Sequence, residues 1–129
     1  MERFLFGLFI VLHGFVHLWY FTLSQKLVEF QPEMGWHGES WLLSKFLGDL
    51  TRRSLASGLY VVAALAFVLS GIGIFSNAGW SATALAVSAT FSSATILLFW
   101  DGETDMLMQK GFIGLLINVL ILIVTFLPT

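Results

Sequence analysis

Four long apolar runs, each near the length of a membrane-spanning helix, constrain the fold of this chain more than any other feature. About 20 apolar residues in a helix cross the hydrocarbon core of a bilayer. A helix satisfies its own backbone hydrogen bonds in lipid, and four segments are too few to close a barrel. We therefore predict an all-α membrane protein, with four transmembrane helices in one bundle, at residues 4–23, 54–75, 80–100 and 107–127.

The composition agrees with this prediction. Charged residues make up 11% of the 129 residues and hydrophobic residues 57%, whereas a soluble domain carries roughly 25% charged residues. No convincing linker interrupts the chain, so we expect a single domain over residues 1–129. The net charge of −2 argues against a nucleic-acid partner, and the absence of cysteine excludes disulfides and thiolate metal sites.

The basic residues predict an orientation in the membrane. Five of them fall in the first and third loops, and only Arg3 lies on the other side; the five are Lys26, Lys45, Arg52, Arg53 and Lys110. Cytoplasmic loops carry the excess of lysine and arginine. We expect both termini outside and these two loops in the cytoplasm, in a prokaryotic plasma membrane whose lipid bilayer is the main partner.

The segment between the first two helices has its own pattern. Apolar residues recur at helical spacing over residues 40–50, with polar residues mostly between them. This pattern predicts a short amphipathic helix lying in the headgroup region. The alternative is a flap folded over the mouth of the bundle.

Small residues predict where the helices pack, because close approach replaces the hydrophobic effect between helices in lipid. Gly7 and Gly14 lie two turns apart on the first helix, and Gly111, Gly114 and Asn118 share a face of the fourth. The third helix carries two stripes of small residues, one being Ala82, Ala86, Thr90 and Ala94 and the other Ala84, Ser88 and Ser92.

Two histidines are the sharpest functional signal. His13 and His17 are four residues apart, so they share one face of the first helix. An ionisable side chain inside a membrane helix predicts a functional site. The competing interpretation is that each imidazole only packs against a polar group of a neighbouring helix, such as Thr90, Thr95, Asp101 or Asn118.

The acidic turn at residues 101–105 lies on the same predicted side of the membrane as His17. Asp101 directly follows the helix-terminal Trp100 and is expected to point into the bundle. His13, His17 and Asp101 could then ligate one divalent metal ion. A quinone headgroup is another candidate ligand, since its carbonyls accept hydrogen bonds; haem fits less well, because both membrane histidines are on one helix.

A family resemblance adds to this interpretation. The segment RFLFG at residues 3–7, followed by Leu12-His13-Gly14, resembles the first helix of DoxX-like proteins, which are small four-helix membrane proteins. The resemblance implies an association with quinone-linked sulfur oxidation and carries over only to His13 and Gly14. The second helix has no acidic residue that extends the match.

The sequence thus predicts a small membrane protein with a polar histidine site formed by His13, His17, Asp101 and Asn118, which binds a quinone, a redox cofactor or another small ligand. An alternative is a non-catalytic accessory subunit, whose polar residues pack against other membrane subunits or a second copy. A third hypothesis is a metal-binding membrane enzyme or transporter. The sequence leaves open whether a reaction is catalysed.

Overall fold

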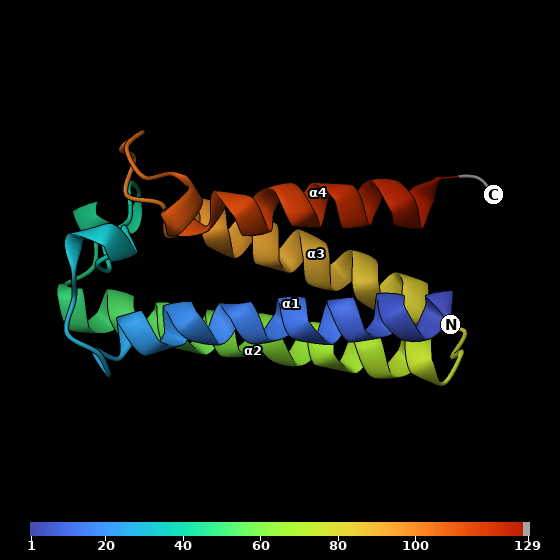
Figure 1. Cartoon of the computed structure of the whole chain (residues 1–129). Coiled ribbons are helices and arrows are strands. Elements are labelled where there is room, and N and C mark those ends of the chain that lie inside the picture. The colour runs from blue at the N-terminus through green and yellow to red at the C-terminus, as the bar shows by residue number, and fades with distance from the viewer. Residues whose placement is uncertain (128–129) are drawn as a thin grey trace.

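The computed structural model describes residues 1–127, which fold into four long helices and contain no strand (Figure 1). The helices are α1 (Glu2–Ser24), α2 (Asp49–Phe75), α3 (Ser81–Leu98) and α4 (Ile113–Phe126). All four are long and apolar enough to cross a membrane, α4 when counted from Met108. Residues 128 and 129 of the predicted domain lie outside the described range.

Two helices, α2 and α4, start well away from the predicted residues. α2 begins at Asp49 and not at residue 54, and its first turn is stabilised by ion pairs of Asp49 with Arg52 and Arg53. α4 is preceded by a π-helical turn, η3 (Met108–Phe112), in which Gly111 has a φ of 107°. A β-carbon disfavours that backbone conformation, so glycine is the residue that permits this kinked entry.

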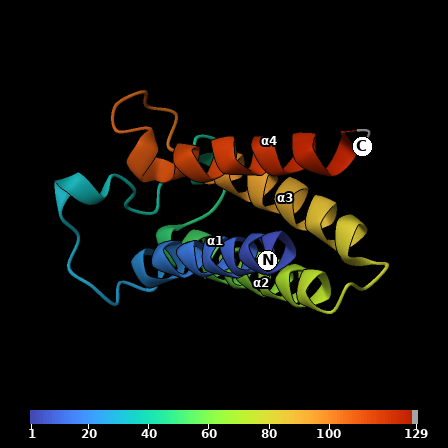
Figure 2. The ribbon, with the colours of Figure 1, turned by 45° about the vertical axis from the view of Figure 1, so that its right-hand side comes forward.

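The helices pack in chain order, α1 against α2, α2 against α3 and α3 against α4. Figures 1 and 2 both show α3 lying between the α1–α2 pair and α4. The backbones of α1 and α4 are not a closely packed pair. α1 therefore has one tightly packed neighbour, α2, and a second side that faces α4 across a looser seam.

Glycines explain the close contact between α1 and α2. A β-carbon at Gly14 would lie 2.9 Å from Cβ of Phe67 and 3.0 Å from the carbonyl oxygen of Ala64. A β-carbon at Gly7 would lie 2.9 Å from the ring of Phe75. The prediction that Gly7 and Gly14 serve helix packing is confirmed.

On α3 the two predicted stripes separate. Ser88 and Ser92 are buried, whereas Ala82, Thr90 and Ala94 are exposed. The hydroxyl groups of Ser88 and Ser70 lie 3.1 Å apart across the α2–α3 contact. Ala84 and Ala86 are both half-buried, so it is Ser88 and Ser92 that turn the second stripe toward the other helices.

The segment between α1 and α2 folds over one end of the helices, which matches the flap alternative. Trp36 is 1% exposed and packs among Tyr20, Tyr60 and Phe99. The helix predicted at residues 40–50 is absent; the structure has only a 3-10 turn, η2 (Leu43–Lys45). The main reason is a pair of hydrogen bonds that hold this segment at the end of α3. The Ser40 hydroxyl donates to the carbonyl of Leu98, and the Trp41 backbone N–H donates to the carbonyl of Trp100.

Candidate functional site

His13 and His17 lie on the face of α1 that is turned toward the other helices. They are 4% and 3% exposed, although most apolar residues around them on α1 are exposed. The prediction that both imidazoles face the interior is confirmed. A polar ring facing hydrocarbon would forgo its hydrogen bonds, and this cost explains why the apolar side chains take the outer face.

The two imidazoles belong to one hydrogen-bonded network that joins three helices. Nε2 of His13 lies 2.8 Å from Oδ1 of Asn118 on α4, and Nδ2 of Asn118 donates to Oγ of Ser92 on α3 at 2.9 Å. Oγ of Ser92 lies 2.5 Å from Nε2 of His17. Nδ1 of His17 reaches back to the carbonyl oxygens of His13 and Gly14, at 3.1 and 3.2 Å.

Of the predicted polar neighbours, Asn118 is present and 0% exposed, whereas the threonines are not part of the network. Thr90 and Thr95 donate to carbonyls of their own helix, four residues back. Ser92 was assigned only to helix packing by the sequence. Its spacing of four from Ser88 placed it on an inward stripe, but no sequence signal distinguished it from the other small residues.

A pocket of about 200 Å3 lies beside this network, in the seam between α1 and α4. Its polar lining consists of His13, His17 and Tyr20. Its other walls are apolar and include Val16, Ile96, Met108 and Ile117. The hydroxyl of Tyr20 donates to the backbone carbonyl of Gln109 at 3.2 Å, and its ring stacks on Tyr60 with centroids 5.1 Å apart.

Two glycines of the fourth-helix region leave room for this pocket. Gly111 and Gly114 both line it. A β-carbon at Gly114 would lie 3.5 Å from Cδ1 of Ile96 and 4.0 Å from Cε1 of His13. These are ordinary van der Waals distances, so a methyl group would fit there without a clash. The face predicted from Gly111, Gly114 and Asn118 is therefore the face that α4 presents to the histidines.

Asp101 does not join the histidines. Its carboxylate pairs with the ammonium group of Lys110 at 2.9 Å, and Asp105 pairs with the same group at 3.2 Å. The Lys110 side chain is only 2% exposed, so it requires nearby anions. Within residues 1–127, no three histidine, aspartate or glutamate side chains gather closely enough to hold a metal ion, so the metal site predicted from His13, His17 and Asp101 is not assembled.

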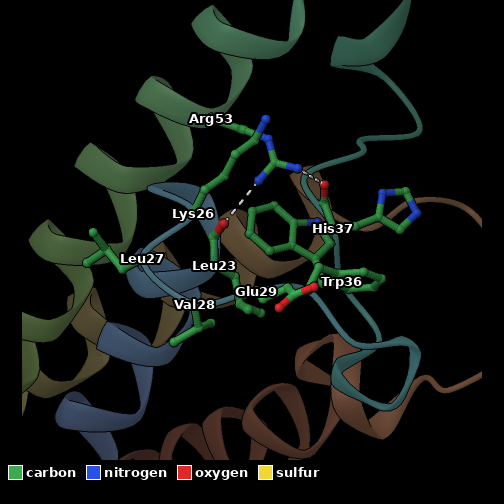
Figure 3. Close-up of a pocket in the computed structure, with 9 residues that line it drawn as sticks. Leu23, Lys26, Leu27, Val28, Glu29, Trp36, His37 and Arg53 are labelled. Carbon is green, nitrogen blue, oxygen red and sulfur yellow. Dashed lines mark hydrogen bonds between the residues drawn. The ribbon is translucent and has the colours of Figure 1, made fainter.

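Several charged residues gather at the end of the helices that the loop between α1 and α2 covers. Figure 3 shows residues that line a second hollow there, among them Lys26, His37 and Arg53. Its volume is about 420 Å3. The guanidinium of Arg53 donates to the backbone carbonyls of Leu23 and His37, and that of Arg52 donates to the carbonyl of Gly38. Both arginines thus hold the loop on the helix ends.

Comparison with known proteins identifies no relative. No family model, no curated protein and no solved structure matches the chain. Membership of the DoxX-like family therefore stays a prediction, and the function rests on the geometry of the site.

Proposed function

We propose that this chain is an integral membrane protein whose pocket between α1 and α4 binds a small, lipid-soluble ring ligand of the quinone and quinol class. The pocket itself carries the proposal, since about 200 Å3 of largely apolar space is bordered by two imidazoles and a phenol. An apolar cavity of about 150 Å3 accommodates benzene. The volume therefore suits one substituted ring and is too small for haem.

The position of the pocket supports entry from the lipid. α1 and α4 are not a closely packed pair, and two apolar residues of the pocket wall, Val16 and Ile113, are 54% and 52% exposed. A ligand dissolved in the bilayer would reach the imidazoles through this seam without crossing the polar end of the molecule. Its apolar tail would remain among the lipids while its ring occupies the pocket.

The surface of the helices supports the membrane location. Large apolar side chains are exposed on all of them, for example Leu65 at 64%, Val87 at 61% and Leu120 at 61%. A soluble monomer rarely exposes so much contiguous apolar surface. Phe46 and Leu50, at 76% and 80% exposure, would lie in the headgroup region beside the polar end.

The proposed orientation places this polar end in the cytoplasm and both termini outside, following the excess of lysine and arginine in the first and third loops. The chain has no cysteine, so single cysteines can be introduced without background. Cysteines at Asn77 and at Glu103 should react with an impermeant thiol reagent from opposite sides of the membrane. Labelling of both positions from one side would rule out four crossings.

The DoxX-like resemblance supports the same ligand class. Of the two positions to which it carries over, His13 lines the pocket, and Gly14 packs against α2. Family membership would associate the protein with quinone-linked sulfur oxidation. We propose this membership as a hypothesis that agrees with the pocket.

The direct test fills the pocket. A leucine at Gly114 would project into the space next to Ile96 and His13, so Gly114→Leu should abolish binding of alkyl-substituted benzoquinones and hydroquinones. Gly58→Leu is the matched control, because Gly58 is exposed on α2 with no atom within 4 Å of its added β-carbon. Calorimetric titration of the purified protein in detergent would measure both. Equal binding by the two variants would contradict the proposal.

The second candidate function is an accessory subunit, and the open α1–α4 seam is the observation that favours it. A helix of a partner could cover the seam and insert a side chain into the pocket. A photo-crosslinking residue in place of Ile113 should then capture a single membrane protein in native membranes. Crosslinks to lipid alone would contradict this candidate.

A further inference from the structure

We propose that the histidine pocket selects ligands that donate a hydrogen bond, so that it binds the hydroxyl-bearing quinol or phenol form in preference to the quinone. The inference rests on the proposed function, because it concerns the same pocket. It follows from which group donates and which accepts at each hydrogen bond of the network, whose members are His17, Ser92, Asn118 and His13.

The direction is fixed at His17. Its Nδ1 faces the carbonyl oxygens of His13 and Gly14, which accept hydrogen bonds only, so Nδ1 carries the proton. A neutral imidazole has one N–H, and Nε2 must therefore accept. The group that donates to it is the hydroxyl of Ser92, at 2.5 Å.

The same direction continues to His13. Since the proton of the Ser92 hydroxyl is used by His17, the oxygen of Ser92 accepts from the amide nitrogen of Asn118. The amide oxygen of Asn118 then faces Nε2 of His13 and accepts from it. The proton of neutral His13 is therefore on Nε2, and its Nδ1 carries a lone pair.

The opposite orientation of the Asn118 amide is excluded by counting protons. If its oxygen faced Ser92, the Ser92 hydroxyl would have to donate to Asn118, and the short contact to His17 would join two acceptors. Only a charged imidazole at His17, with a proton on both nitrogens, would supply a donor for this contact. Charged imidazoles need an anion nearby, and the ion pairs of residues 1–127 all involve Lys26, Arg52, Arg53 or Lys110.

Nδ1 of His13 is the atom left for a ligand. It has no hydrogen-bond partner among the described residues. Every side-chain nitrogen or oxygen of these residues that is fully closed off from the surface does have a partner. Nδ1 therefore keeps accessible surface. His13 lines the pocket, and its Cε1, the carbon between the two ring nitrogens, lies 4.0 Å from the β-carbon that would be added at Gly114. Because Nε2 is used by Asn118, Nδ1 is the ring nitrogen that remains for a ligand.

The polar groups of the pocket thus offer acceptors. The hydroxyl of Tyr20 donates its proton to the carbonyl of Gln109, so its oxygen also accepts. A quinone has only acceptor oxygens and would set lone pair against lone pair at His13. A quinol or phenol hydroxyl supplies the missing proton.

Matched ligands test the inference without any redox step. A para-alkylphenol, its methyl ether and the alkyl benzoquinone have similar ring size, but only the phenol donates. In calorimetric titration the phenol should bind about tenfold more tightly than the ether or the quinone. A tenfold difference in Kd corresponds to about 1.4 kcal/mol, which is the contribution of one hydrogen bond. Equal affinities, all lost in Gly114→Leu, would overturn the inference and keep the proposed function. Failure of all three ligands to bind would overturn the proposed function itself.

Ser92→Ala tests the directional argument. Without the hydroxyl, the Asn118 amide is free to turn and His13 to change tautomer, so the preference for phenol over ether should shrink toward one. Ser88→Ala is the control, because Ser88 is buried on the same helix and bonds to Ala84 and Ser70. Nitrogen NMR of ¹⁵N-histidine-labelled protein should show Nδ1 of His13 unprotonated. A protonated Nδ1 at His13, or an unchanged preference in Ser92→Ala, would overturn the inference.

Discussion

The two sides of α1 differ in what holds them to their neighbours. On the α2 side, glycines bring backbones together, and the gap at Gly14 is too small for a methyl group. On the α4 side, the backbones stay apart and a side-chain bridge from His13 to Asn118 spans the distance, with the pocket next to it.

This difference teaches how one helix can serve both stability and binding. Close packing gives van der Waals contact at no cost in unpaired polar groups, so the α1–α2 seam is suited to holding the fold. A polar bridge keeps two helices in register at a greater separation. The α1–α4 seam is therefore the place where a ligand can enter without breaking the packing that defines the molecule.

The largest effect is expected on the tight side. Gly14→Ala places a methyl group 2.9 Å from Cβ of Phe67 and 3.0 Å from a backbone oxygen of Ala64, and neither atom belongs to a flexible chain end. Forced repacking of this kind costs about 1–3 kcal/mol of unfolding free energy. Denaturation of the purified protein by SDS, followed by circular dichroism, would measure the loss.

The control for this substitution is Gly58→Ala, at an exposed position of α2 with no neighbour within 4 Å of the new methyl group. It should leave stability unchanged or raise it slightly. If Gly14→Ala is no more destabilising than Gly58→Ala, the α1–α2 seam is not the tight side and the comparison fails.

The next effect concerns the bridge. Asn118→Leu keeps the number and branching of the side-chain heavy atoms but removes the partner of both His13 and Ser92. Hydrogen bonds between membrane helices contribute about 1–2 kcal/mol, so stability should fall by roughly that amount. The same denaturation experiment applies. An unchanged midpoint would mean that the bridge does not hold α4.

Much of this arrangement could be predicted from the sequence, because it follows from local periodicity. Runs of apolar residues fixed the approximate bounds of the four helices, and the spacing of four placed His13 and His17 on one face. The cost of an unpaired imidazole in lipid turned that face inward. The same argument makes Asn118 a candidate partner, as a polar residue within the apolar run of the last helix.

The errors came from long-range contacts that leave no periodic signal. The position of Asp101 directly after α3 suggests a contact with the histidines, but its carboxylate pairs with the buried, oppositely charged ammonium of Lys110 at 2.9 Å. The helix predicted over residues 40–50 does not form, because Ser40 and Trp41 make hydrogen bonds with the end of α3 instead. In both cases a tertiary partner outweighed a correct local pattern.

The smallest expected effect distinguishes the two seams most directly. Gly114→Ala makes the same chemical change as Gly14→Ala, but its methyl group would lie at ordinary contact distance, 3.5 Å from Cδ1 of Ile96. Replacing glycine inside a helix by alanine gains about 0.5–1 kcal/mol of conformational free energy. We therefore expect a slightly higher SDS midpoint together with weaker phenol binding, because the methyl group takes up part of the pocket. A loss of stability comparable to that of Gly14→Ala would show that the α1–α4 seam is as tight as the α1–α2 seam and has no room for a ring.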